Sequence, residues 1–275
     1  MAFGYIGSEP TNDKSSNNGV FDIKSLNKLR KDENLSSEGF DVDFLIQAGG
    51  GGSRNGLGTG GGGSGQLVTS SGNNGGGSTA EPSFRAYVGK SYDVQIGGGA
   101  SSTVGGSSRF GNISALGGGG GATQNSASYP GGGAARFSGT GTRDSTWATL
   151  LGYASDEYYE QFGHNTIGHY IGGSGAYNEG RAGGGGTGGA GSSGGGTGGV
   201  GRINNDFLSS TEATTESVGE VSSTNVYFGG GGSGGDYYEA ISPSGGLGGG
   251  GNNSQNGTAN TGGGGGGSRN NSGGS

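Results

Sequence analysis

The stretch Val42-Asp43-Phe44-Leu45-Ile46-Gln47-Ala48 runs directly into Gly49-Gly50-Gly51-Gly52, and this change from apolar residues to pure glycine decides the fold. The apolar residues are of the types that form a short β-strand. The glycines have no side chains and add nothing to a hydrophobic core. The pairing recurs, because the other apolar clusters also lie just before or after glycine runs: Leu67-Val68, Phe84 to Val88, Tyr92 to Ile96, Ile113 to Leu116 and Val226-Tyr227-Phe228.

The overall composition, in contrast, is typical of a disordered chain. Of 275 residues, 78 are glycine and 4 are proline. Leu, Ile, Val and Phe together make up about 15 % of the chain, which is too little for an ordinary core of this length. Disorder therefore stays open as one interpretation, and the placing of the apolar clusters beside the glycine runs favours a folded chain.

Glycine runs can fold without a hydrophobic core. They recur from Gly49–Gly52 to Gly262–Gly267 without a Gly-X-Y period, so a collagen triple helix is excluded. Polyglycine can still adopt a left-handed helix of three residues per turn, rising about 3.1 Å per residue. Without side chains, such helices approach closely enough for N–H···O and Cα–H···O contacts between backbones. Because glycine loses the most entropy on ordering, we expect strands to clamp the edges of the bundle.

These observations predict a mainly β chain with irregular or polyglycine II helices, divided into an N-terminal segment, 1–41, and a glycine-rich domain, 42–275. Within the segment, Asp22 to Asp32 predicts a short N-terminal α-helix, because its apolar residues are spaced three apart and Asp22 suits the N-cap. So short a helix needs a surface to dock on. The sequence leaves open whether that surface is its own domain or another protein. The apolar residues are Ile23, Leu26 and Leu29.

An aromatic insertion interrupts the glycine-rich domain at about 136–181. It combines aromatic rings with an acidic patch at Asp156, Glu157 and Glu160. Such rings beside acidic groups suit sugar faces and recognition surfaces. The alternative is that the rings pack into a local core or between subunits. The candidate binding residues are Trp147, Tyr153, Tyr158, Tyr159, His164, His169, Tyr170 and Tyr177.

Charge and composition argue against several classes of protein. The net charge of −7 and the pI near 4.8 disfavour nucleic-acid binding, because phosphate backbones repel an acidic chain. No cysteine is present, so disulfides and thiolate metal sites are excluded. No apolar stretch approaches the length that spans a bilayer, and no signal peptide is visible, so we expect neither membrane insertion nor export by the usual signal.

The motifs that could indicate catalysis are weak. Gly89-Lys90-Ser91 lacks the upstream glycine of a phosphate-binding loop, because Phe84 stands there, and a strand turn explains it better. His164 and His169 lie five residues apart, a poor spacing for metal ligands on one helical face. No serine is marked as a nucleophile. We therefore expect no metal, no cofactor and no enzymatic activity.

Several segments resemble a known group of proteins. Ala2-Phe3-Gly4-Tyr5-Ile6-Gly7 and Asn18-Gly19-Val20-Phe21-Asp22-Ile23 resemble the N-terminal segment of bacteriophage tail-fibre and related virion proteins, especially of marine phages. Residues 42–52 resemble the opening strand of the glycine-rich domain that follows in that group. Residues 88–97, 106–117 and 260–267 resemble its turn-and-strand element, its next hairpin and its closing glycine segment. The resemblance touches roughly two thirds of the chain and skips 136–181.

The resemblance implies a virion protein with β-sandwich-like strands framing a glycine-helix bundle. It implies that the N-terminal segment attaches the chain to other virion proteins and that the glycine-rich domain displays loops toward a host surface glycan or protein. The aromatic residues of the insertion are the candidates for that contact. The chain would be assembled in the host cytoplasm and located in the virion. The candidate attachment residues are Phe3, Tyr5, Phe21, Ile23, Leu26 and Leu29.

One departure bears on the oligomeric state. Domains of this group usually end in an apolar strand after the last glycine run, whereas this sequence ends in Gly273-Gly274-Ser275. The sandwich either has an open edge that a neighbouring subunit fills, or differs from the group there. We expect a homo-oligomer, with a trimer favoured.

Two other functions remain open on the sequence alone. A purely architectural decoration or connector protein of the particle would bury Tyr158, Tyr159 and Tyr170 between subunits. A non-viral ice-binding or matrix protein would use the polyglycine bundle as a regular surface.

Overall fold

A computed structural model describes residues 11–12, 17–18, 39–53, 59–77, 79–87, 89–121, 182–192, 196–235 and 242–268. Contacts divide the chain into two compact units, one of Met1–Val42 with Phe84–Ser91, the other of Asp43–Ser83 with Tyr92–Ser275. The described residues form small antiparallel sheets with little helix, which confirms the prediction of a mainly β chain. The helix predicted over 22–32 lies outside the described residues.

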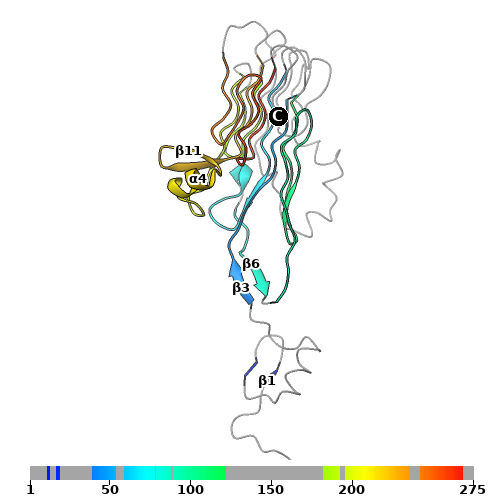
Figure 1. The fold of residues 1–275 in the computed structure, drawn as a ribbon, viewed down its shortest axis with the longest axis vertical. Coiled ribbons are helices and arrows are strands. Elements are labelled where there is room, and N and C mark those ends of the chain that lie inside the picture. Colours follow the sequence, from blue (N-terminus) through cyan, green and yellow to red (C-terminus); the bar gives the residue numbers. More distant parts are fainter. Residues whose placement is uncertain are drawn as a thin grey trace, which may run out of the picture. The chain divides into compact units, whose positions relative to one another are not determined.

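The first unit contains two strand pairs. Strand β1 (Thr11–Asn12) pairs with β2 (Asn17–Asn18), and β3 (Gly39–Val42) pairs with β6 (Phe84–Tyr87), both antiparallel (Figure 1). In the second pair Asp41 lies opposite Arg85, and their side chains form an exposed ion pair of 3.1 Å. After β6, Gly89 has a φ of 79° and Lys90 donates its N–H to the Tyr87 carbonyl, as the strand-turn interpretation predicts.

The second unit contains three small sheets. Strand β4 (Leu45–Gln47) pairs with β5 (Leu67–Thr69). Strands β7 (Val94–Gln95), β8 (Ser108–Phe110) and β9 (Ile113–Ala115) form a sheet in chain order. Strands β10 (Arg202–Ile203), β12 (Asn225–Phe228) and β11 (Glu220–Ser222) form the third, with β12 in the centre.

A small apolar core lies where these strands meet the helix α4 (Ser210–Glu216). Its buried members are Leu67 of β5, Ala213 of α4, and Val226 and Phe228 of β12. The partly buried side chains packed against them are Leu45, Leu208, Val218 and Val221. The sequence clusters therefore predicted the core strands correctly.

Other elements were missed or shorter than predicted. The strand predicted over Tyr92 to Ile96 is only Val94–Gln95. Strands β3, β10 and β11 and helix α4 were not predicted. Helix α4 has a start signal, because Ser209 and Glu212 form a capping box. It has no apolar period, however, and of its residues only Ala213 is buried.

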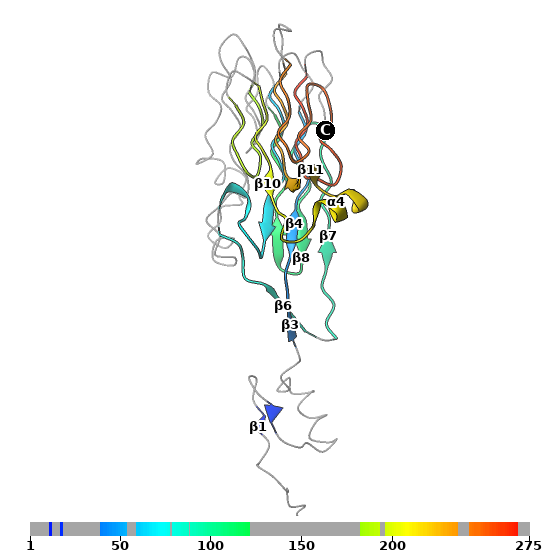
Figure 2. The same cartoon turned by 90° about the vertical axis from the view of Figure 1, so that its left-hand side faces the viewer.

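The strands of the second unit are connected through glycine segments, which run side by side away from the sheets (Figures 1 and 2). We use this name for residues 48–53, 59–66, 97–106, 116–121, 182–188, 197–201, 229–235, 244–251 and 262–268.

Candidate functional site

The glycine segment 59–66 bonds to three neighbours in rotation. Gly62 donates its N–H to the Gly265 carbonyl (2.8 Å), Gly63 to Gly119 (2.7 Å) and Ser64 to Gly185 (2.9 Å). The next residues repeat the order, since Gly65 donates to Gly262 and Gln66 to Leu116. Residues three apart therefore bond to the same neighbouring segment.

The segment 229–235 shows the same repeat of three. Gly230 and Ser233 donate to the segment 244–251, at Gly248 (2.8 Å) and Gly251 (2.9 Å). The next residues, Gly231 and Gly234, donate to Gly199 and Gly196, and after them Gly232 and Gly235 donate to Gly62 and Thr59. Each of these two segments therefore forms backbone hydrogen bonds in three directions. A strand in a β-sheet forms them in only two.

The spacing between segments excludes side chains. A Cβ on Gly62 would overlap the carbonyl oxygen of Gly51, and a Cβ on Gly232 would overlap that of Gly265. A Cβ on Gly118 would overlap that of Gly63. These glycines are therefore required by close backbone approach, a different requirement from the freedom of φ that glycine supplies in turns.

Chain connectivity gives the glycine segments two ends. Residues 48, 66, 116 and 229 adjoin β4, β5, β9 and β12, so we call this the strand end. Residues 53, 59, 121 and 235 terminate the same segments at the other end, which we call the far end.

Buried hydroxyl groups hold the far end together. The hydroxyls of Ser53 and Thr59 lie 2.9 Å apart, and Ser268 donates its N–H to the Thr59 hydroxyl at 2.7 Å. Gly235 donates its N–H to the Thr59 carbonyl at 2.7 Å. Ser53, Thr59 and Ser268 are fully buried. This polar cluster satisfies backbone groups where the repeat ends.

The described residues that flank five other ranges of the chain lie at or near this cluster. Ser53 and Thr59 flank 54–58, Gly235 precedes 236–241, and Ser268 precedes 269–275. Gly121 and Ala182 flank 122–181; Gly121 donates to Gly52, and Ala182 accepts from Gly61. Gly196, which follows 193–195, accepts from Gly234. The far end is therefore the place where the chain enters and leaves the range that contains the aromatic insertion.

The predicted site residues themselves lie outside the described residues. This holds for the candidate receptor-binding residues, from Trp147 to Tyr177, and for the candidate attachment residues, from Phe3 to Leu29. Their roles stay predictions.

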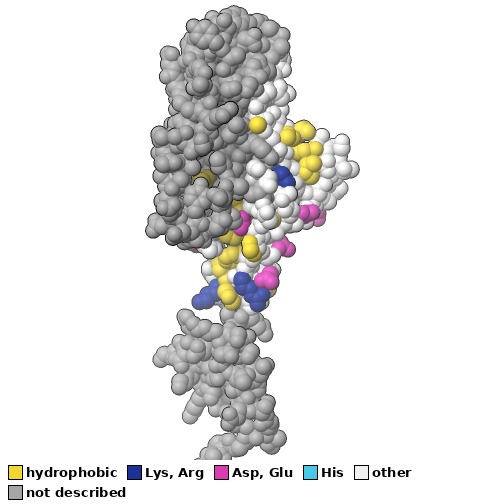
Figure 3. Space-filling view, turned by 180° about the vertical axis from the view of Figure 1, so that it is seen from behind, with side chains coloured by type: hydrophobic (Ala, Val, Ile, Leu, Met, Phe, Trp, Pro, Cys, Tyr) yellow, Lys and Arg dark blue, Asp and Glu magenta, His cyan; other side chains and the backbone are white. Residues whose placement is uncertain are grey.

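The glycine segments carry no charge. None of their residues is Lys, Arg, Asp or Glu, and much of the described surface visible along them is backbone and uncharged polar side chains (Figure 3). Three apolar side chains of these segments are also exposed, those of Val104, Val200 and Leu247. One carboxylate meets them from outside: Glu220 of β11 accepts the N–H groups of Gly248 (2.6 Å) and Gly249 (2.7 Å). Both glycines have positive φ, of 99° and 87°, so this carboxylate fixes a turn that glycine alone can make readily.

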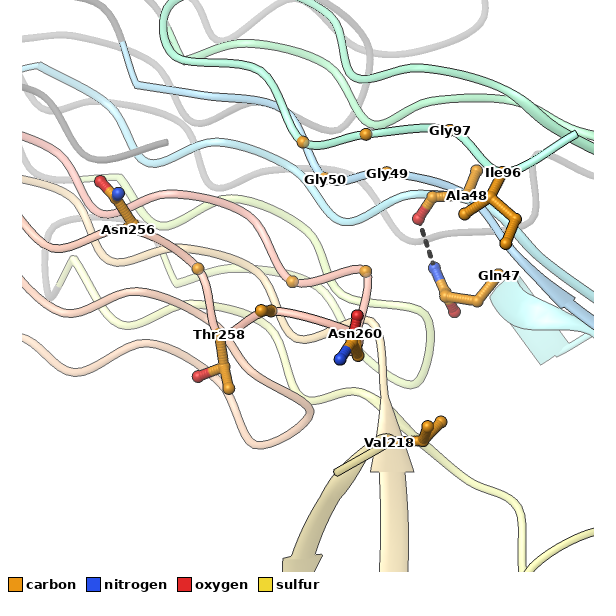
Figure 4. Close-up of a pocket in the computed structure, with 16 residues that line it drawn as sticks. Gln47, Ala48, Gly49, Gly50, Ile96, Gly97, Val218, Asn256, Thr258 and Asn260 are labelled. Carbon is orange, nitrogen blue, oxygen red and sulfur yellow. Dashed lines mark hydrogen bonds between the residues drawn. The ribbon is translucent and has the colours of Figure 1, made fainter. Parts of the chain in front are cut away.

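A groove of about 620 Å³ opens beside the segment 48–53, toward the strand end. It is lined by residues 47–50, 96–99, 256–260 and 262–263 and by Val218 (Figure 4). Gln47 donates its side-chain amide to the carbonyls of Ala48 (3.1 Å) and Gly65 (3.0 Å). The Gln47 Oε1 is buried and has no hydrogen-bond partner among the described residues. No lining residue is charged.

The described residues contain neither a candidate metal site nor a membrane-spanning helix. Among them, no cluster of three His, Cys, Asp or Glu side chains could hold a metal ion. In the same part of the chain, no helix is long and apolar enough to cross a membrane.

No family model, curated protein or solved structure matches the chain.

Proposed function

We propose that this chain is a structural component of a bacteriophage virion, a tail fibre or adhesin that presents loops to a receptor on the host surface. The single observation that carries the proposal is that the described residues flanking five ranges of the chain lie together at the far end of the glycine segments. One of them contains the candidate receptor-binding residues Trp147 to Tyr177. Loops on a rigid scaffold are the usual place for recognition.

In this proposal the glycine segments are polyglycine II helices. The repeat of three in their hydrogen bonds supports that assignment, because a polyglycine II helix has three residues per turn. The short strands frame the helices as a β-sandwich-like clamp. The helix bundle gives an uncharged body with few large side chains, whose shape depends mainly on backbone hydrogen bonds.

The remaining roles are those that the sequence predicts. Residues 1–41 attach the chain to other virion proteins, and the chain forms a homo-oligomer, with a trimer favoured. The ligand is a host surface glycan or protein. No cofactor or catalytic step is required.

Antibodies distinguish this proposal from its alternatives. Antibodies against the folded chain should label intact phage particles in electron microscopy. Antibodies against residues 136–181 should also block adsorption to host cells, while antibodies against the exposed face of α4 should label without blocking. Absence of label would overturn the virion assignment. Label without any block would favour the purely architectural role, and thermal hysteresis of the purified chain would favour the ice-binding one.

A further inference from the structure

The segment 48–53 uses only two of its three bonding directions. Ala48 and Gly51 donate to the segment 59–66, at Gln66 (3.0 Å) and Gly63 (2.8 Å). Gly49 and Gly52 donate to the 103–106 part of the segment 97–106, at Gly106 (3.0 Å) and Thr103 (3.1 Å). The N–H of Gly50 points in the third direction. Its backbone is buried, and no described group accepts its N–H.

The neighbours of this segment fix where the third direction leads. The carbonyl of Gly50 accepts from Ala100 (3.1 Å), and the carbonyl of Gly51 accepts from Gly265 (2.9 Å). The segments 97–100 and 262–268 are therefore both neighbours of 48–53. In a chain with a repeat of three, the directions in which N–H groups donate alternate with those in which carbonyls accept. The N–H of Gly50 is therefore directed between these two segments.

Bonds among the neighbours close the rest of the ring. Segment 262–268 bonds to 59–66, and 59–66 bonds to 116–121. Segment 116–121 bonds to 103–106 through Gly105 N–H and Gly118 carbonyl (2.9 Å), and 103–106 bonds to 97–100 through Gly106 N–H and Gly98 carbonyl (2.8 Å). The ring is interrupted only between 97–100 and 262–268 among the described residues. The groove lies at this interruption (Figure 4).

Two glycines at the groove have no packing reason within the chain. A Cβ on Gly97 would overlap the carbonyl of Gly106, as in the rest of the bundle. A Cβ on Gly98 would meet nothing within 4 Å, and one on Gly99 would meet only the Gly50 carbonyl at 3.8 Å. Neither residue donates its N–H to a described acceptor. Small size at these positions is explained if another backbone lies against them.

The polar groups that line the groove favour a polypeptide backbone as its ligand. Within the described part of the chain, the N–H groups of Gly50, Gly98 and Gly99 have no acceptor, and the Gly263 carbonyl and Gln47 Oε1 have no donor. Such a set suits a chain that alternates N–H and C=O. The absence of charge in the lining disfavours an ionic ligand. Ile96, which lines the groove at the strand end, is 85 % exposed, and Val94, two residues before it in the edge strand β7, is exposed as well.

We propose that the groove binds an extended segment of a different polypeptide, with apolar residues beside Val94 and Ile96 followed by glycines beside Gly50 and Gly98. Edge-strand pairing of this kind is an established mode of peptide binding. A second copy of this chain is a poorer occupant, because its described strand–glycine junctions are already bonded within its own bundle. The inference stands on these hydrogen bonds and does not depend on the virion role.

The probe is an acetylated, amidated peptide of sequence Val-Thr-Ile-Gly-Gly-Gly-Gly-Ser, titrated into the ¹⁵N-labelled full chain and followed by NMR. Saturable shifts of the Gly50, Gly98 and Gly99 amides are expected, with a dissociation constant of about 1 mM for so short a probe. The matched peptide with four alanines in place of the glycines should bind at least about tenfold more weakly, because its Cβ atoms cannot fit. Absence of saturable shifts, or equal binding of the alanine peptide, would overturn the proposal.

Variants of the chain locate the binding. Gly98→Val should leave the melting temperature unchanged, because the valine side chain enters open space. It should weaken the binding of the peptide by at least about tenfold. Gly99→Ala is the second variant if Gly98→Val fails to fold. Unchanged peptide binding in a folded variant would contradict the proposal. Self-association of the unmodified chain that Gly98→Val abolishes would show instead that a second copy is the occupant.

Discussion

The strand end and the glycine segments of the same unit are ordered by opposite means. At the strand end, Leu67, Val226 and Phe228 bury apolar side chains against one another, as in any small β domain. In the glycine segments, the N–H of Gly62 or Gly63 reaches a neighbouring carbonyl because no side chain stands between the backbones. A unique packing can therefore be specified by side-chain shape in one region and by the lack of side chains in the other.

The largest effect is expected from Gly62→Ala. Its Cβ would overlap the carbonyl of Gly51, in a segment that bonds to three neighbours, so we expect a loss of more than about 4 kcal/mol and no cooperative unfolding at room temperature. Gly98→Ala is the matched control, since its Cβ meets nothing within 4 Å. Thermal unfolding followed by circular dichroism compares the two. Equal melting of both variants would mean that the segments do not pack closely.

The next effect tests the apolar region. Phe228 is 2 % exposed, and Phe228→Ala should cost about 3 to 5 kcal/mol in a denaturant titration because it leaves a cavity in the apolar core beside α4. Phe40→Ala, at an exposed position, should change stability by less than about 0.5 kcal/mol. If Phe228→Ala were as mild as its control, the glycine segments would fold independently of the strand end.

Glu220→Gln tests the contact between the two regions. The carboxylate accepts two N–H groups, from Gly248 and Gly249, and the neutral amide should weaken both bonds. We expect a loss of about 1 to 2 kcal/mol, measured by denaturant titration. The exposed Glu216 supplies the control substitution, Glu216→Gln. A loss no larger than that of the control would show that the turn at Gly248 holds its shape without the charge.

The smallest effect concerns the capping box of α4. The hydrogen bonds from Ser209, first from its backbone N–H and then from its hydroxyl, lower the pKa of Glu212 below 4.5. Because the folded-state pKa is lowered, the stabilising contribution is complete at neutral pH and is lost as the pH falls through that pKa. NMR titration should show the low pKa, and Ser209→Ala should raise it. An unchanged Glu212 pKa in Ser209→Ala would contradict the assignment.

The sequence predicted the strand end better than the glycine segments. Apolar clusters beside glycine runs correctly indicated β4, β5, β9 and β12, since burial of apolar side chains leaves a local pattern. Helix α4 was missed because its only local sign is the Ser209–Glu212 capping box. The partners of each glycine segment could not be predicted, because Thr59 bonds Ser268 across 209 positions and every run has the same residue.

The candidate sites divide in the same way. The aromatic insertion was visible in the sequence because Trp147 and the tyrosines differ from their surroundings, and its role stays a prediction. The groove was not visible, because Gly50 and Gly98 read like every other glycine in the chain. Only the hydrogen bonds made by their neighbours distinguish them.

The most direct test of the central claim is a measurement of scalar couplings across hydrogen bonds in the ¹⁵N,¹³C-labelled protein. Three consecutive amides should couple to carbonyls of three different segments: Gly62 to Gly265, Gly63 to Gly119 and Ser64 to Gly185. Those amides should also exchange with solvent slowly. Random-coil chemical shifts and fast exchange at residues 62–64, with no such couplings, would contradict the account and show that the glycine runs are solvated loops.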